Sequence, residues 1–263
     1  MNRLLLILLL FNLNSLIAQK GDSITQKLYQ DYKFEKDSLF FFNGITSNEF
    51  SAIIIPKKIE RQYSYHVFTE QNDGSYNKLL HWSVPIKIFL DKSIPETIRE
   101  DFKQFVMFLP KIERLSVSIV GNKNDANYYI VPVSRPINPT EDDFFKGITS
   151  VTMADDSEKL YFGRLTFNPN QFNNPVILMT RLKQFFFSSL GNFNFSRSLN
   201  QNSLLALNYM DTRTISKYDY MLLFYHYSLY NKNPIGYPEY KKLMQKINTT
   251  TFTNLNGRIN IKL

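Results

Sequence analysis

The chain has 263 residues, with 31 Lys and Arg against 23 Asp and Glu, three His, nine Gly and no Cys. Without Cys it cannot form a disulfide, a thiolate zinc site or an iron–sulfur cluster, and it has no cysteine nucleophile. The sequence also lacks a glycine-rich phosphate loop and a G-x-S-x-G motif. A hydrophobic fraction of 43% and a charged fraction of 21% indicate a folded protein with a large core.

Residues 1–18 have the pattern of a secretory signal peptide. Arg3 supplies the positive start, residues 4–11 are apolar throughout, and Ala18 is a small residue at the cleavage position. This run is shorter than the ~20 apolar residues of a spanning helix, although an uncleaved N-terminal anchor is the alternative. No later stretch reaches spanning length. We therefore expect a periplasmic or secreted product that is not an integral membrane protein.

The remaining chain divides by the strength of its hydrophobic pattern. Residues 19–80 have a weak pattern, with one buried strand at 51–55, and are interpreted as an N-terminal extension. Residues 81–235 form the main domain, and residues 236–263 form a basic C-terminal tail. The main domain is predicted to contain a strand at 82–90, a helix from a Ser93–Glu96 capping box to Pro110, strands at 115–119, 126–133, 148–153 and 160–167, a helix at 174–191, and a last helix from about Thr214.

This order predicts an α+β domain with a mixed β-sheet, two long helices packed on it and a third, C-terminal helix. The order and several motifs resemble the zincin metalloproteases, specifically their metzincin-like group. The matching pieces are W-x-x-P-I-x-I at 82–88, A-N-Y-Y-I at 126–130 and the Leu190-Gly191 pair that ends a helix. The resemblance implies a zincin-like fold whose central helix would carry H-E-x-x-H-x-x-G-x-x-H.

A bacterial family of metalloprotease-like proteins of unknown function resembles the chain better. There the central helix reads E-x-x-x-Q-x-L-G without histidines, and an S-[IV]-F turn and a D-x-x-[LI]-L helix follow. Ser203-Leu204-Leu205 and residues 219–223, which start at Asp219, fit this outline.

The residues at the expected metal positions decide the functional prediction. With Gly191 as the fixed point, these positions hold Gln184, Phe185, Ser188 and Asn194. Amides and a hydroxyl are poor zinc ligands, and a phenyl ring cannot accept a proton. The resemblance therefore implies a pseudoenzyme, with no metal, cofactor or catalytic residue, that acts as a binding or scaffold module in the cell envelope. The four residues are possible binding positions of a degenerate cleft. The alternatives are core packing for Phe185 and an exposed helix face for the others.

The competing hypothesis is a hydrolase with an unrecognised His and carboxylate site. His226, between two tyrosines, and His81, beside Trp82, are the candidate bases, although buried packing roles suit both. The acidic runs at 141–143 and 155–156 match no calcium-loop spacing and are interpreted as solvated turns.

The C-terminal tail is basic because no acidic residue follows Glu239. Such a segment could contact an anionic surface such as lipid headgroups or an anionic polysaccharide, and a solvated terminus is the alternative. A nucleic-acid partner is not expected, since no recognised motif is present. The basic residues of the tail are Lys241, Lys242, Lys246, Arg258 and Lys262.

Overall fold

The computed structural model describes residues 38–46, 49–71, 73–112, 114–138, 142–210, 215–229, 235–249 and 259–262. The chain divides into two units, residues 1–38 and 39–263, and apart from Ser38, the first residue of β1, the features below belong to the second unit. The predicted signal peptide at 1–18 and the tail residue Arg258 lie outside the described residues.

The described chain alternates strands and helices, which confirms the predicted α+β class. In chain order the elements are β1 (Ser38–Thr46), β2 (Glu49–Pro56), α2 (Lys57–Val67), β3 (His81–Trp82), β4 (Ile86–Leu90), α3 (Glu96–Phe108), β5 (Val117–Ile119), η1 (Lys123–Asp125), β6 (Tyr128–Pro132), η2 (Asp143–Phe145), β7 (Ile148–Ala154), β8 (Lys159–Phe167), η3 (Pro169–Gln171), α4 (Pro175–Ser189), α5 (Lys217–Ser228), α6 (Tyr237–Thr249) and β9 (Ile259–Lys262).

The main sheet is mixed, as predicted. It has six strands in the order β3-β8-β6-β4-β5, and β7 pairs with β8 outside this path. The pairs β4–β5, β4–β6, β6–β8 and β3–β8 are parallel, whereas β7 runs antiparallel to β8. The antiparallel strand β7 therefore forms one edge of an otherwise parallel sheet.

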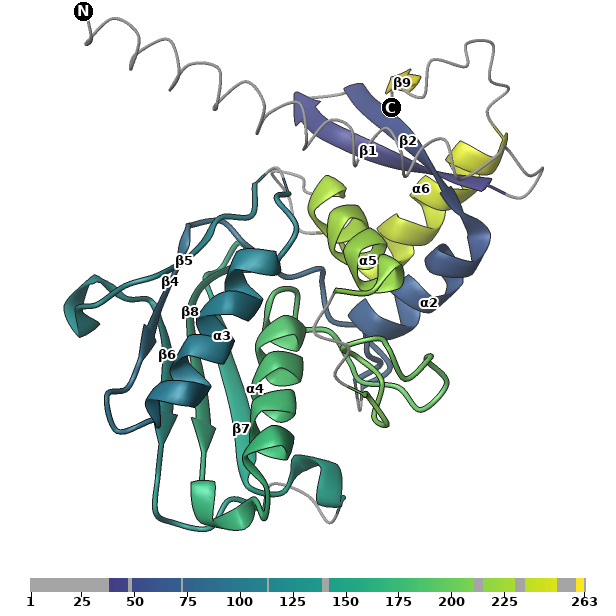
Figure 1. Cartoon of the computed structure of the whole chain (residues 1–263). Coiled ribbons are helices and arrows are strands. Elements are labelled where there is room, and N and C mark those ends of the chain that lie inside the picture. Colours follow the sequence, from purple (N-terminus) through teal and green to yellow (C-terminus); the bar gives the residue numbers. More distant parts are fainter. Residues whose placement is uncertain are drawn as a thin grey trace, which may run out of the picture. The chain divides into compact units, whose positions relative to one another are not determined.

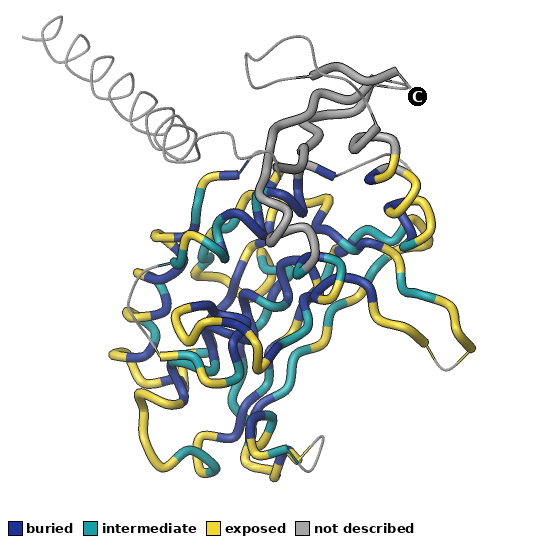
Figure 2. The backbone as a smooth tube through the Cα atoms, turned by 90° about the vertical axis from the view of Figure 1, so that its right-hand side faces the viewer, coloured by how far each residue is buried: buried dark blue, intermediate teal, exposed yellow. Residues whose placement is uncertain are grey.

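Helices α3 and α4 lie side by side against one face of this sheet (Figure 1). The predicted apolar stripe of α3 is confirmed, because Ile98, Phe102 and Phe105 are all buried. Phe186 of α4 packs its ring edge-on against Phe102 and Tyr128, at centroid distances of 5.5 and 5.1 Å. Buried residues (dark blue in Figure 2) run through the inner elements, and this layer between helices and sheet is the core.

The predicted strand at 82–90 is two strands in the structure. Pro85 separates them, because proline has no N–H for a ladder hydrogen bond. Asn127 bridges the break: its Oδ1 accepts from the Lys87 N–H at 2.7 Å, and its Nδ2 donates to the Pro85 carbonyl at 3.0 Å. The two pieces pair with different neighbours, β3 with β8 and β4 with β5 and β6.

The predicted capping box before α3 is wrong. The Ser93 hydroxyl donates to Asp91 Oδ1 at 2.6 Å, and the helix begins at Glu96 with Pro95 as its N-cap and no side-chain cap. The predicted start of α4 is confirmed, since the Asn174 side chain accepts a hydrogen bond from the Val176 N–H at 2.8 Å. The last predicted helix starts slightly later than expected, at Lys217, because Ser216 is its cap.

Regular structure extends beyond the predicted main domain. The strand predicted at 51–55 lies within β2, which belongs to a three-stranded sheet of order β1-β2-β9. The segment 236–263, interpreted from sequence as a tail, contains the helix α6 and the strand β9. Tyr63 of α2 is fully buried against Tyr225 of α5 and Tyr240 of α6, so the N-terminal extension and the C-terminal segment share a core.

Candidate functional site

Helix α4 is the structural centre of the candidate site, and it is buried on most of its surface. Gln184, at the first of the expected metal positions, has no exposed surface. Its Nε2 donates to the carbonyls of Leu204 and Ala206 at 3.1 and 2.7 Å, and its Oε1 accepts from Arg181 at 2.8 Å. The Gln184 amide therefore holds the turn that contains residues 203–206 and does not point into a cleft.

The same turn is held from its other side by Asp219 of α5. The fully buried carboxylate accepts hydrogen bonds from the Ser203 hydroxyl at 2.6 Å and from the Leu204 N–H at 2.8 Å. It also accepts from the Ser216 hydroxyl at 2.8 Å. Burial raises the pKa of Asp219 to about 6, while these hydrogen bonds act to lower the pKa. The turn is thus fixed between α4 and α5 by one amide and one carboxyl group.

The other three predicted positions lie together near the end of α4. Phe185 is 5% exposed and packs against Phe195 at a centroid distance of 5.2 Å. The Ser188 hydroxyl donates to the Phe193 carbonyl at 2.6 Å. The Asn194 Nδ2 donates to the Thr69 hydroxyl at 2.8 Å, which joins the loop after α4 to the end of α2.

These three residues line a cavity of about 570 Å³ between α4 and the edge strand β7. Thr149, Ser150 and Thr152 contribute from β7, and Tyr65 and Thr69 contribute from the α2 region. Gln184 is not among the lining residues. The structure therefore brings Phe185, Ser188 and Asn194 to one cavity, whereas Gln184 contacts the turn at Leu204 and Ala206. The lining residues from α2 and η2 were not predicted, because nothing in their local sequence marks them.

Among the described strands only β8 pairs with β7, and the other side of the β7 backbone is the edge considered next. Gly163 of β8 donates its N–H to Asn127 on the β6 side, at 2.9 Å. Thr152 is the register partner of Gly163 in β7. Opposed residues in an antiparallel pair alternate between hydrogen-bonded and non-hydrogen-bonded pairs. Thr152 and Gly163 therefore form a non-hydrogen-bonded pair, and the Thr152 amide faces away from β8, toward the open edge.

His226, the alternative catalytic candidate, is a structural residue. It has no exposed surface, and its two ring nitrogens contact the Leu80 carbonyl at 2.6 Å and the Tyr63 hydroxyl at 3.1 Å. Because a carbonyl only accepts, Nε2 carries the proton and Nδ1 accepts from Tyr63. Burial lowers the pKa of His226 to about 3. A Cβ at Gly191 would lie 2.7 Å from His226 Nε2, which explains the glycine after α4.

The other two histidines are also buried. The ring of His66 contacts the Asn194 carbonyl through Nδ1 at 2.7 Å, and burial lowers its pKa. His81 is 3% exposed, and burial together with the nearby charges of Lys159 and Arg114 lowers its pKa to about 4. Neither histidine lines the cavity beside β7. His81 and His226 are both buried and lie close enough for the charge of His81 to lower the pKa of His226.

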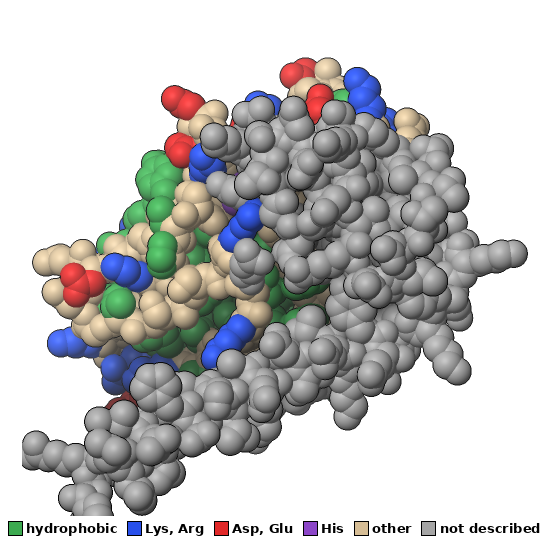
Figure 3. Space-filling view, turned by 90° about the horizontal axis from the view of Figure 1, so that it is seen from above, with side chains coloured by type: hydrophobic (Ala, Val, Ile, Leu, Met, Phe, Trp, Pro, Cys, Tyr) green, Lys and Arg blue, Asp and Glu red, His purple; other side chains and the backbone are tan. Residues whose placement is uncertain are grey.

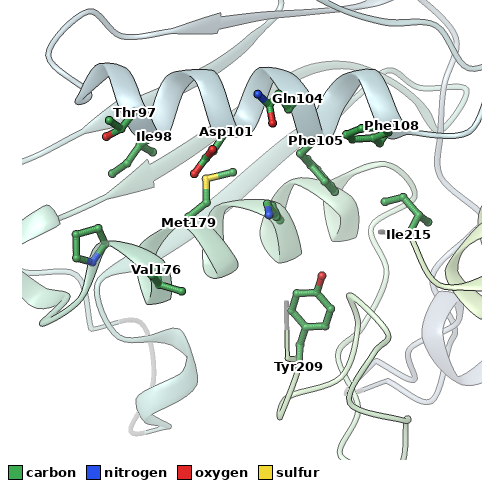
Figure 4. Close-up of a pocket in the computed structure, with 12 residues that line it drawn as sticks. Thr97, Ile98, Asp101, Gln104, Phe105, Phe108, Val176, Met179, Tyr209 and Ile215 are labelled. Atoms are coloured by element: carbon green, nitrogen blue, oxygen red, sulfur yellow. The ribbon is translucent and has the colours of Figure 1, made fainter. Parts of the chain in front are cut away.

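A second hollow, of about 580 Å³, lies between α3 and α4 (Figure 4). Its lining is largely apolar, and Asp101 of α3 and Met179 of α4 point toward each other across it. Phe108 and Val176 at its borders are 65% and 64% exposed. The groove contains none of the residues predicted to form a site.

The charged features singled out in the sequence lie at the surface. Asp155 and Asp156 form an exposed turn between β7 and β8, as interpreted. Lys241 and Lys242 are exposed on α6, and Lys262 lies in β9. On the face seen in Figure 3, Lys and Arg side chains (blue) of the described residues lie at several places among polar (tan) and apolar (green) ones.

Two further observations concern only the described residues. Nowhere in this part of the chain do three or more His, Asp or Glu side chains cluster closely enough to hold a metal ion. Likewise, none of the helices described there combines the length and apolar character needed to cross a membrane.

A scan of the chain against protein-family models gives no match, and no curated protein matches the sequence.

Proposed function

We propose that the chain is an exported, metalloprotease-like protein without catalytic activity, which binds extended peptide segments of a partner in the cell envelope. The observation that carries this proposal is the cavity of about 570 Å³ between α4 and the open edge of β7. The mixed sheet with two helices on one face supports the zincin-like resemblance. The predicted signal peptide supports the export.

The edge strand supplies the means of binding. Among the described strands, β7 pairs only with β8, so one side of its backbone is open to a further strand. An extended peptide that pairs with such an edge gains main-chain hydrogen bonds, and pockets beside the edge select its alternate side chains. The cavity adjoins β7 through Ser150 and Thr152 and is bordered by aromatic rings, including Tyr65, Phe185 and Phe195. This lining favours a peptide with an apolar or aromatic side chain at the position that enters the cavity.

The polar groups at the positions that the resemblance aligns with metal ligands have structural partners, which argues against hydrolysis by the zincin mechanism. Gln184, Ser188 and Asn194 each donate to a protein acceptor. Removing the Gln184 or Ser188 donor would leave a buried carbonyl acceptor unsatisfied, so these two groups act as structural anchors, whereas Asn194 donates to the exposed Thr69 hydroxyl. No observation favours the alternative hydrolase, because both nitrogens of His226 are engaged inside the core.

The test uses a peptide selected from a random display library on the immobilised protein, with binding measured by fluorescence anisotropy. Thr152→Pro removes the amide at the open edge, and proline is tolerated where a strand's N–H faces away from the ladder. We expect this variant to bind the peptide about tenfold more weakly. The matched control Thr152→Ala keeps the amide, and its affinity should stay within about twofold of wild type.

A second arm tests the backbone of the peptide itself. The same peptide with alternate residues N-methylated cannot form the ladder hydrogen bonds, and we expect its binding to be lost. Failure to select any peptide contradicts the proposal, as does equal binding of the native and N-methylated peptides.

A further inference from the structure

The face of the main sheet opposite α3 and α4 carries a second surface of distinct chemistry. Side chains alternate between the two faces along each strand. In β4, Ile86, Ile88 and Leu90 are buried on the helix side, whereas Lys87 is exposed on the opposite face. In β8, Leu165 and Phe167 are buried while Arg164 is exposed. We call this opposite side the outer face.

The outer face has a floor of aromatic and aliphatic side chains around one arginine. The strand registers align Phe89, Tyr129, Arg164 and Val151 in one row across β4, β6, β8 and β7. Next to this row, Phe162 lies against Tyr129, with ring centroids 5.6 Å apart and planes inclined by 38°. Val151 is 55% exposed. Because Phe89 is only 8% exposed, the accessible part of the outer face consists of Tyr129, Phe162 and Val151 around the Arg164 guanidinium.

The charged side chains of the strands β4 to β8 are all positive. The five strands β4 to β8 contain Lys87, Lys159 and Arg164 and no Asp or Glu. The acidic residues nearest in sequence, such as Asp125 and Asp155, lie beyond the strand ends. An anionic ligand laid across the strands would thus meet cations on the strand residues and no like charge.

The two aromatic rings of the outer face are partly covered and inclined to each other. The Tyr129 hydroxyl donates to the Ala126 carbonyl at 2.8 Å, which anchors the ring along the sheet surface. Tyr129 and Phe162 are both half-buried. Half-buried aromatic rings beside an exposed cation suit the apolar face of a saccharide ring that carries an anionic group.

We propose that the outer face binds a polysaccharide that carries carboxylate groups, such as a polymer of uronic acids. The guanidinium of Arg164 matches a carboxylate bidentately, and Lys87 adds a second cation on the same face. The apolar faces of the sugar rings pack on Tyr129, Phe162 and Val151, and this burial stabilises the complex. This site uses side chains on the outer face, including Val151 of β7, whereas the peptide pairs with the backbone edge of β7, so the proposal does not rest on the function proposed there.

The experiment measures binding of the purified protein to polygalacturonate, with neutral dextran and a single-stranded DNA oligonucleotide as comparison ligands, by isothermal titration at low salt. We expect binding to polygalacturonate that weakens as salt is added, and no measurable binding to dextran. Arg164→Ala should weaken binding about tenfold. Lys103→Ala, which removes one exposed cation from α3 on the other face, should change it less than about twofold.

Phe162→Ala tests the apolar floor, with Phe108→Ala on α3 as its matched control, and thermal unfolding checks that each variant is folded. Loss of affinity in Phe162→Ala alone supports the proposal. The proposal is overturned if polygalacturonate does not bind, or if it binds equally to the wild type and to Arg164→Ala. Tighter binding of the DNA oligonucleotide that depends on Arg164 would also overturn it, because the outer face would then be a nucleic-acid site.

Discussion

The Asp219 carboxylate accepts a hydrogen bond of 2.6 Å from the Ser203 hydroxyl, which ties helix α5 to the turn beneath the candidate site. The neighbouring carbonyls of this turn, from Leu204 and Ala206, accept from the Gln184 amide of α4. Two helices distant in the sequence thus hold one short turn through buried polar groups. Buried polar networks of this kind are costly to break, because each lost partner leaves a desolvated group unpaired.

The raised pKa of Asp219 predicts a specific pH dependence of stability. Its folded-state pKa is about 6 against an unfolded value of 3.8. The stabilising contribution is therefore fully present below pH 3.8 and is lost as the pH rises through about 6. Urea unfolding of wild type and Asp219→Asn across this pH range measures this contribution. The difference between the two free energies of unfolding isolates the effect of the Asp219 carboxyl group. We expect that difference to shrink as the pH rises.

Asp219→Asn should also be less stable than wild type throughout, because an amide nitrogen cannot accept from both the Leu204 N–H and the Ser216 hydroxyl. A stability difference that does not change between pH 4 and pH 6.5 contradicts the assignment.

Replacing Gln184 with methionine tests its structural role, because methionine keeps most of the volume and removes the hydrogen bonds. We expect a loss of about 1–3 kcal/mol in the free energy of unfolding, from unpaired carbonyls at Leu204 and Ala206. Chemical denaturation checks this, with the exposed substitution Lys103→Ala expected within about 0.5 kcal/mol of wild type. Equal stability of Gln184→Met and wild type would show that the amide does not hold the turn.

The buried histidines should remain neutral over the physiological range. The pKa of His226 is about 3 and that of His81 about 4, in both cases chiefly through burial. The stability that these neutral rings contribute is present above their unfolded pKa of 6.5 and is lost as the pH falls toward 4 and below. NMR of 13C,15N-labelled histidine should show His226 with its proton on Nε2 and no titration between pH 5.5 and 8. A His226 ring that titrates near pH 6.5 would contradict its structural role and would support the alternative that it acts as a catalytic base.

The pseudoenzyme proposal predicts that the protein binds no structural or catalytic zinc. Purified protein that has been incubated with zinc and then dialysed should contain far less than one zinc ion per chain, as measured by inductively coupled plasma mass spectrometry. About one zinc per chain, lost in a Gln184→Ala or Asn194→Ala variant, would reverse the proposal, because those residues would then ligate the metal.

The local signals in the sequence predicted the main elements well, because alternation and caps act over a few residues. The strands at 148–153 and 160–167 correspond to the β7–β8 hairpin, and Asn174 caps α4 as expected. The break at Pro85 was missed because the apolar alternation continues across it. Only the tertiary pairing with Asn127 shows that the strand divides there.

The site was predicted less well, because its geometry depends on contacts between distant segments. Gln184 and Ser188 differ in burial although they share one helix, since Gln184 faces the turn from α4 and Ser188 faces the loop at Phe193. The contribution of Thr69 and Tyr65 to the cavity comes from α2, in a region of weak hydrophobic pattern. No periodicity in the sequence could place these residues beside α4.

The central claim is that a peptide pairs with the open edge of β7, and amide hydrogen exchange at Thr152 tests it most directly. With a bound peptide from the display selection, we expect the exchange of the Thr152 amide to slow by about tenfold or more, because the amide becomes a hydrogen-bond donor to the peptide. The Arg164 amide, on the neighbouring strand, should not change. Peptide binding that leaves the exchange rate of Thr152 unaltered would contradict the account.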